Sequence, residues 1–357
     1  MYLKEVEPER HHQLAKNAKK LGIFVHNLTI LLEDGLSDDE ILPIYNLLPY
    51  MQNIRSLTIV HERGDVTPHS ALHRVVDGLS RLEHLTMKEN TYDRAFSRLP
   101  RSHIPVTRTF FHRFLHAVLS THGSQLRSLH LYTLLALHRN LYIKLRDDTP
   151  KLRWVTFAGN IDEALEDEFE EPIPWSSGKT GSLEGLVLLN CNLHSSYFAR
   201  NVLCGVYGTR LKVVKVIACG SNRAGKYYIP LGPTHFCSGS IEHLQADHMT
   251  AWELEVLSHI PTRELSLTRL RAKNFRHLPV QLREKVLHPD GTQSGFPGLE
   301  ILRLNPSIAH SEAWERFPND CKEAYEELTE GCLPERGIKL SLDAVVWPDA
   351  CRVHSHI

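Results

Sequence analysis

The sequence lacks the features that mark several large classes of protein. Its seven cysteines are odd in number and contain no C-x-x-C pair, which argues against both a disulfide framework and a structural zinc site. No run of about 18 consecutive apolar residues occurs, and the N-terminus has no apolar core of signal-peptide length. We therefore expect reduced thiols in a cytoplasmic or nuclear protein that does not enter a membrane.

An excess of charge of either sign is also missing. The chain carries 41 Lys and Arg against 42 Asp and Glu, so its net charge is -1. A protein without a global electrostatic field is poorly suited to hold a nucleic acid or an acidic membrane surface. We expect neither as a partner.

What the sequence does contain is a repeated apolar triplet with the spacing L-x-x-L-x-L. It returns eleven times along the 357 residues, with a mean interval near 31 residues. The copies are Val25/Leu28/Ile30, Ile54/Leu57/Ile59, Leu82/Leu85/Met87, Leu126/Leu129/Leu131, Leu152/Val155/Phe157, Leu183/Leu186/Leu188, Leu211/Val214/Val216, Ile241/Leu244/Ala246, Thr262/Leu265/Leu267, Leu299/Leu302/Leu304 and Gly337/Leu340/Leu342.

The spacing within the triplet predicts a strand. Residues two apart in a strand share a face, so Leu186 and Leu188 point inward while Gly185, Val187 and Leu189 point outward. A single strand of this kind cannot bury its apolar face, whereas stacked copies can. The sequence therefore predicts an α/β leucine-rich-repeat solenoid, an irregular horseshoe with parallel strands on the concave face and helices on the convex face.

Two further patterns support the repeat. Asn or Cys follows the triplet by three residues in four copies, at Asn90, Asn160, Cys191 and Cys219, as leucine-rich repeats favour. Apolar residues at helical spacing occur between the predicted strands, in residues 41–48, 111–118, 252–257 and 275–282. The predicted unit is a strand, a turn and a covering helix.

The predicted organisation has three parts. Residues 1–24 form an N-terminal helical cap, 25–309 form the repeat array, and 310–357 form a C-terminal helical region with a last strand. The array is interrupted near 91–107, a polar stretch with prolines, and near 161–182, which combines an acidic run with prolines. Both are predicted surface insertions.

The outward side chains of the strands are the candidate binding surface. Aromatic residues and Arg anchor protein interfaces, and short polar groups add hydrogen bonds to them. A solvated strand position is the alternative interpretation for each of these residues, and Trp154 could equally pack beneath the 161–182 insertion. The predicted partner-binding residues are His84, His130, Tyr132, Trp154, Lys215, His243, Gln245, Asp247, Arg303 and Asn305.

Motifs that would indicate catalysis are incomplete. Gly220 to Lys226 fits half of a phosphate-binding loop, but Tyr227 stands where Ser or Thr should bind magnesium, and the prolines that follow cannot open a helix. His112 and His116 have the spacing of a metal pair without a third ligand. No G-x-S-x-G motif occurs. We expect no enzyme, metal or cofactor, and an enzyme or nucleotide-binding protein is the minor alternative.

Several strings resemble the leucine-rich region of fungal F-box proteins. They are LPYMQNIRSLTI, GSQLRSLHL, TPKLRWVTF, IEHLQADHM and FPGLEILRLNPSI, and the resemblance covers roughly residues 20–345. It implies that the repeats hold a substrate protein, while an F-box docks a linker subunit of a cullin ubiquitin ligase. The phrase that opens an F-box, L-P-x-E, is approached only at Leu333-Pro334-Glu335. The linker is therefore expected as a partner only if an F-box lies upstream, and a stand-alone repeat scaffold or inhibitor is the alternative.

Overall fold

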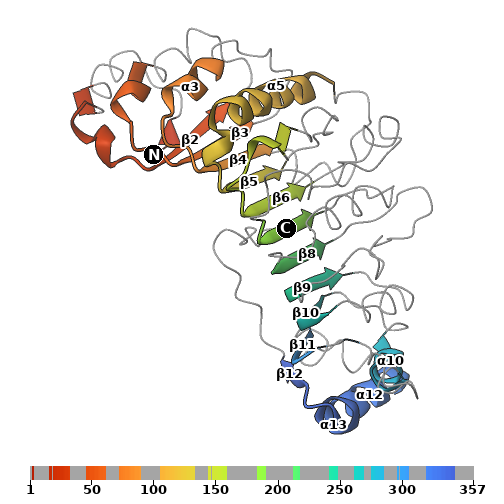
Figure 1. Cartoon of the computed structure of the whole chain (residues 1–357). Coiled ribbons are helices and arrows are strands. Elements are labelled where there is room, and N and C mark those ends of the chain that lie inside the picture. The colour runs from red at the N-terminus through yellow and green to blue at the C-terminus, as the bar shows by residue number, and fades with distance from the viewer. Residues whose placement is uncertain are drawn as a thin grey trace. The chain divides into compact units, whose positions relative to one another are not determined.

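The protein is an α/β chain with parallel strands that follow one another in chain order, as seen in a computed structural model (Figure 1). The chain divides into two compact units, and in the described part the first ends with strand β6 and the second begins at Leu183. The structure describes residues 2–3, 16–17, 19–32, 46–61, 72–89, 105–132, 144–145, 147–158, 183–189, 212–217, 241–247, 261–268, 275–284, 296, 298–304 and 319–341.

In the first unit, six strands lie in the order β1 to β6 across the described residues, and each pairs in parallel with the next. Their bounds, with those of the helices between them, are β1 Tyr2–Leu3, η1 Gly22–Phe24, β2 Asn27–Leu32, η2 Leu48–Tyr50, β3 Ser56–His61, α3 Leu72–Gly78, β4 His84–Glu89, α5 Pro105–His122, η4 Gly123–Gln125, β5 Ser128–Tyr132 and β6 Trp154–Ala158.

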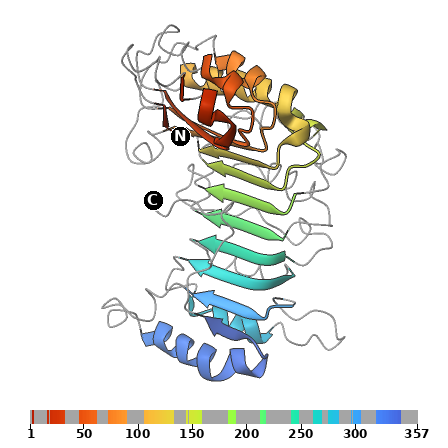
Figure 2. The same cartoon turned by 90° about the vertical axis from the view of Figure 1, so that its left-hand side faces the viewer.

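The second unit repeats this arrangement, with parallel strands in the order β7 to β12 (Figure 2). Its elements are β7 Gly185–Leu189, β8 Val213–Ile217, β9 Ile241–Asp247, β10 Thr262–Thr268, α10 Leu278–Glu284, β11 Ile301–Leu304, α12 Asn319–Glu326, the π-helical turn η10 Glu327–Cys332, α13 Leu333–Glu335 and β12 Lys339–Ser341.

The strands confirm the prediction from the apolar triplets. Each of the eleven predicted strands overlaps an observed one, from β2 to β12, and the second triplet residue always faces the second triplet residue of the next strand where a pairing is described. Leu57, Leu129, Leu186 and Leu302 are each fully buried. Continuous apolar rows therefore form the core, because every strand adds its inward residues to those of its neighbour.

A second regular feature ties consecutive strands together. The carbonyl oxygen of the residue just before a strand accepts backbone hydrogen bonds from two successive N–H groups of the next repeat: Arg55 accepts from Glu83 and His84 at 2.8 and 2.9 Å. Arg127 does the same for Arg153 and Trp154, and Glu184 for Lys212 and Val213. These bonds set the register, so no strand can slip without losing several of them.

The helices follow the predicted apolar spacing where they are described. Phe114, Leu115 and Val118 of α5 are buried, and so are Leu278 and Leu282 of α10. In the first unit α5 ends against α3, where Nε2 of His122 lies 2.7 Å from the carbonyl oxygen of Val76. Since a carbonyl can only accept, Nε2 carries the proton.

Three expectations differ from the structure: the extent of the 91–107 insertion, the helical character of the N-terminal cap and the openness of one face of β7. Helix α5 already begins at Pro105, so the end of the 91–107 insertion is helical. Within the predicted helical cap, Tyr2–Leu3 form a strand that pairs with β2. The 161–182 insertion and the Asn or Cys positions after the strands lie outside the described residues.

The outward face of β7 is the third difference. All five of its residues are buried, including Gly185, Val187 and Leu189, which the alternating pattern places outward. The run GLVLL is apolar at every position, as expected for a strand that is covered on both faces. The alternation rule therefore assigns the inward side chains correctly here but overestimates how open the other face is.

We predict that Leu186→Asp unfolds the second unit. The substitution would place an unpaired carboxylate in a fully buried position, which costs about 4 kcal/mol. Denaturant unfolding followed by circular dichroism measures the change. Val280→Asp is the matched control, because Val280 belongs to the same unit but is exposed. Equal unfolding midpoints for the two variants would contradict the inward assignment.

Candidate functional site

The predicted partner-binding residues fall into two sets, one in each unit. The first set is His84 on β4, His130 and Tyr132 on β5, and Trp154 on β6, and all four side chains are partly exposed. The second set comprises Lys215 on β8, His243, Gln245 and Asp247 on β9, and Arg303 on β11. The side chain of Asp247 is not described, and Asn305 lies outside the described residues.

In the first unit, two histidines are fixed by hydroxyl groups on the next strand. Nδ1 of His84 lies 2.8 Å from Oγ of Ser128, and Nδ1 of His130 lies 2.9 Å from Oγ1 of Thr156. Each pair consists of residues that stand directly opposite each other in the register. Both imidazole rings are thus oriented by rigid strands, and neither needs a partner molecule to hold it in place.

Both imidazoles are kept uncharged by their surroundings. Burial, together with the positive charge that His84 would carry, lowers the pKa of His130 to about 4. Burial is also the main cause that lowers the pKa of His84. At neutral pH the pair therefore offers hydrogen-bonding edges and aromatic surface, and it carries no charge.

Aromatic surface surrounds these histidines. The rings of His130 and Tyr132 are stacked, with centroids 6.5 Å apart and planes inclined by 12°. Trp154 stands opposite Ser128, and Lys88 stands opposite Tyr132, in neighbouring strands. Partly exposed Tyr and Trp side chains on rigid strands are residues that protein interfaces favour.

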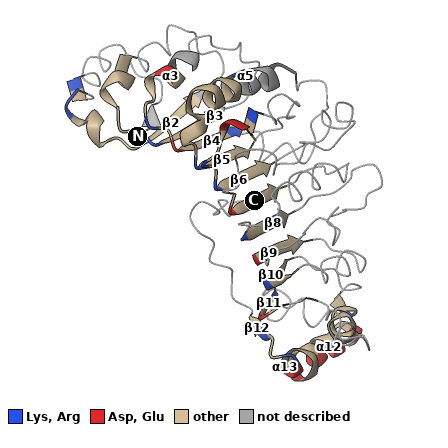
Figure 3. Cartoon of the chain, in the orientation of Figure 1, with Lys and Arg blue, Asp and Glu red and all other residues tan. Residues whose placement is uncertain are grey.

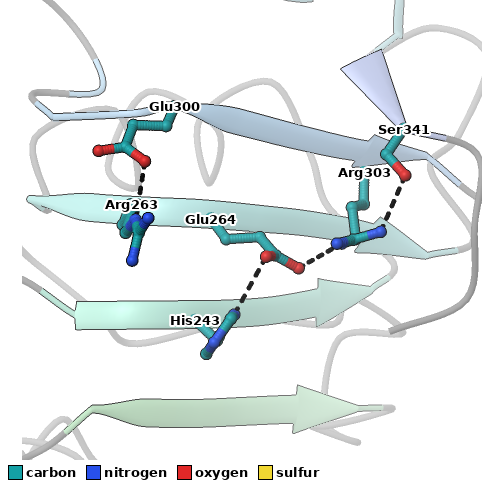
Figure 4. Close-up of polar contacts among 6 residues, drawn as sticks. All are labelled: His243, Arg263, Glu264, Glu300, Arg303 and Ser341. Atoms are coloured by element: carbon teal, nitrogen blue, oxygen red, sulfur yellow. Dashed lines mark hydrogen bonds and ion pairs between the residues drawn. The ribbon is translucent and has the colours of Figure 1, made fainter. Parts of the chain in front are cut away.

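In the second unit, the corresponding face is organised by one carboxylate. Glu264 on β10 is almost completely buried, with a side chain 7% exposed. Nε of Arg303 donates to Oε1 of Glu264, and Nδ1 of His243 lies 3.3 Å from Oε2. Nη1 of Arg303 also donates to Oγ of Ser341, at 2.8 Å (Figure 4). The network spans four strands, β9 to β12. It holds the guanidinium group of Arg303 on both sides, through Glu264 and Ser341.

A neighbouring ion pair shows how much position matters. Arg263 lies on β10, and Glu300 directly precedes β11. Nε of Arg263 is 2.7 Å from Oε2 of Glu300. Their side chains are 63% and 60% exposed, so solvent screens the attraction and the pair contributes little. Glu264 is one residue further along the strand and is buried, so its charge depends on Arg303.

Charges that are exposed or partly exposed alternate in sign along the starts of the strands of the second unit (Figure 3). They are Glu184, Lys212, Glu242, Arg263, Glu300 and Lys339, and Nζ of Lys212 lies 2.9 Å from Oε1 of Glu242. Because each charge is flanked by the opposite sign, the row has no net charge. It stabilises the register weakly and presents no field to a charged partner.

Several outward residues of the second unit are less accessible than expected. Lys215 and Gln245 are each 8% exposed, and Ser266 between Gln245 and Arg303 in the register is 6% exposed. His243 and Arg303 keep partly exposed side chains. The first unit therefore offers more accessible aromatic surface, while the second offers a fixed polar network.

The serine hydroxyls of the two sets are not placed as activated nucleophiles. The hydroxyl of Ser128 that meets His84 is buried, so it cannot reach a substrate, and the hydroxyl of Ser341 is held by Arg303 instead of a base. In the described part of the chain, no group of three or more His, Cys, Asp or Glu residues could hold a metal ion. The glycine-lysine segment 220–226 lies outside it.

Comparisons with known proteins add no assignment. No protein-family model matches the chain, and a search of curated proteins finds no match. Among the described helices, none is long and apolar enough to cross a membrane. The candidate site therefore depends on the geometry alone.

Sequence reasoning named Arg303 and His243 but missed Glu264 as the residue that joins them. It also missed the hydroxyl partners of the histidines. The available signal was the register: once the triplets are aligned, Glu264 stands opposite His243, and Ser128 stands opposite His84. Strand pairs opposite each other in register are the units that stabilise a sheet.

We predict that Arg303→Ala destabilises the second unit by about 3 to 5 kcal/mol, because it leaves Glu264 as an uncompensated buried charge. Arg263→Ala, which removes the same side chain from an exposed pair on the preceding strand, should change the stability much less. Urea unfolding of both variants measures the difference. Adding Glu264→Gln to Arg303→Ala should restore part of the loss. Equal losses for Arg263→Ala and Arg303→Ala would contradict the network.

We also predict that acid destabilises the first unit through His130. An unfolded histidine takes up its proton near pH 6.5, whereas His130 in the folded chain does so only near pH 4. Between these values the unfolded chain binds more protons, so stability present above pH 6.5 falls as the pH drops toward 4. The difference corresponds to about 3 kcal/mol.

The measurement is the unfolding midpoint of the wild type and of His130→Gln between pH 7 and pH 4. The variant should lose less stability over this range, because glutamine does not titrate. His116→Gln, at an exposed position on α5, is the control and should follow the wild type. Parallel curves for wild type and His130→Gln would refute the role of His130.

Proposed function

We propose that this chain is a leucine-rich-repeat solenoid that binds a protein partner through the outward face of its strands. The fold part of the proposal is supported by parallel strands in chain order, each carrying the same apolar triplet in register, and by helices between them. The observation that carries the binding part is the partly exposed group His84, His130, Tyr132 and Trp154, prearranged on rigid strands.

Recognition of a substrate for an F-box-type ubiquitin ligase is the more specific form of this proposal. It is motivated by the repeat phrases that resemble fungal F-box proteins, and it requires an F-box to be present in the full protein. The stand-alone scaffold or inhibitor needs only the strand face. Cysteines without a disulfide or zinc pattern support a cytoplasmic or nuclear setting for either role.

We predict that Tyr132→Ala combined with Trp154→Ala strongly weakens partner binding. Buried aromatic anchors contribute about 2 kcal/mol or more at interface centres, so the loss should be roughly 30-fold or greater. Quantitative affinity capture compares the proteins bound by the wild type with those bound by the variant. Each protein that the variant fails to capture is then purified and titrated against both. Arg303 is unsuitable for this test, because its removal would disturb the buried Glu264.

Tyr325→Ala is the control, since Tyr325 is also a partly exposed aromatic residue but lies on α12. It should bind as the wild type does. A purified partner that binds Tyr132→Ala/Trp154→Ala as tightly as the wild type would refute the proposed surface. Pull-down of the cullin linker subunit with the full-length gene product separates the two forms of the proposal, since only the ligase form retains the linker.

A further inference from the structure

Exposed apolar side chains gather where the segment before strand β2 meets the segment before strand β3. Among the described residues, five large apolar side chains are exposed, and four of them come from two short segments of the first unit. These four are Leu21, Ile23, Phe24 and Tyr50, exposed by 58, 53, 68 and 36%. We name them the N-terminal patch. Folded monomers rarely expose such a group without using it for an interaction.

The two segments of the patch are locked together. Gly22 lies so close to Tyr50 that a Cβ atom at position 22 would stand 2.3 Å from the carbonyl oxygen of Tyr50, which only glycine avoids. Nδ2 of Asn53 donates to the carbonyl oxygen of Ile23 at 2.7 Å, and Nδ1 of His26 lies 3.1 Å from the carbonyl oxygen of Asn53. The patch is therefore a fixed surface, so a partner would meet it already formed.

The described charges of the two segments that form the patch are all positive. Lys16, Lys19 and Lys20 are exposed just before it, and Nζ of Lys19 lies 5.5 Å from the centre of the Tyr50 ring. Described residues 16–17, 19–26 and 46–55 contain Arg55 besides these lysines, and they contain no Asp or Glu. Figure 3 shows blue segments in this part of the first unit and red on the neighbouring α3, whose acidic residue is Asp77. The alternating row of the second unit is neutral by contrast.

We propose that the N-terminal patch docks an acidic amphipathic segment of a partner protein, separately from the strand face. The apolar side chains of the segment would cover Leu21, Ile23, Phe24 and Tyr50, and its carboxylates would pair with the lysines. An anionic membrane is disfavoured as the occupant, because the patch is built on two short turns, η1 and η2, and not on the long amphipathic helix that lies in a membrane interface.

The test uses a synthetic helix-forming peptide with Leu and Phe on one face and Glu on the other. Its control peptide has Lys in place of every Glu. Fluorescence anisotropy follows binding to the full chain, and Ile23→Ser/Phe24→Ser should weaken it at least tenfold. Lys16→Glu/Lys19→Glu/Lys20→Glu should have a similar effect, and added salt should weaken the wild-type complex.

Two matched variants control for changes elsewhere. Val280→Ser alters the fifth exposed apolar side chain, which lies in the second unit, and Lys151→Glu reverses an exposed charge of the first unit. Both should bind the Glu peptide as the wild type does. Since all substituted side chains are exposed, unfolding midpoints should stay unchanged, which separates loss of the surface from loss of the fold.

Three outcomes would overturn the proposal. The first is equal binding of the Glu peptide by the wild type and the patch variants, or equal binding of both peptides. The second is sedimentation with vesicles of anionic phospholipid in the absence of peptide binding, which would assign the patch to a membrane. The third is a concentration-dependent dimer that Phe24→Ser abolishes while the peptide does not bind, which would assign it to a second copy of the chain.

Discussion

The pairing of each strand with the next at a fixed register is the constraint on which the rest of the structure depends. Before several strands, a carbonyl oxygen accepts N–H groups from two successive residues of the next repeat, as at Arg55, Arg127 and Glu184, and residues opposite each other therefore stay opposite. Because side chains alternate between the faces, one fixed register aligns the apolar rows on one side and the polar columns on the other. Core and candidate site are two consequences of the same hydrogen bonds.

The same alternation decides how strongly each charge matters. Arg263 and Glu264 are neighbours in the chain, and both belong to ion pairs with residues of the next repeat. Arg263 extends into solvent, where attraction is screened, whereas Glu264 is buried between Arg303 and His243. An exposed pair can be lost with little consequence. A buried carboxylate cannot lose its arginine, so the Glu264 network constrains which residues β9 to β12 can carry.

The strands could be predicted from sequence because their signal is local and periodic. The triplets identify β2 to β12 and their inward residues, since burial of two apolar residues spaced by two is enough to define a strand face. The outward face is harder to predict. Gly185, Val187 and Leu189 are buried although alternation places them outward, because solvent access there depends on the rest of the fold. The strand Tyr2–Leu3 carries no triplet, so the local apolar pattern does not predict its pairing with β2.

The candidate residues themselves were predictable only as positions. Alignment of the triplets places His130 and Arg303 on the outward columns, but it does not show that His130 bonds to Thr156 or that Arg303 crosses two residues along β10 to reach Glu264. Such diagonal contacts depend on side-chain length and burial, which a pattern of apolar residues does not encode. His84 could be predicted as an outward strand residue. Its lowered pKa could not, because the burial that lowers it exists only in the folded chain.

For the proposed partner, these contacts determine which side chains would be able to make new interactions. A histidine whose Nδ1 is committed to a hydroxyl on the next strand has one ring edge fewer to offer, and an arginine held by Glu264 and Ser341 cannot turn toward a new anion without breaking buried contacts. Recognition should then fall on Tyr132 and Trp154, whose rings have few rotatable bonds and lose little entropy on binding. The pairs His84–Ser128 and His130–Thr156 on strands β4 to β6 hold the two histidines in place. Specificity in this face would thus come from the shape of aromatic side chains on an already ordered sheet, more than from charge.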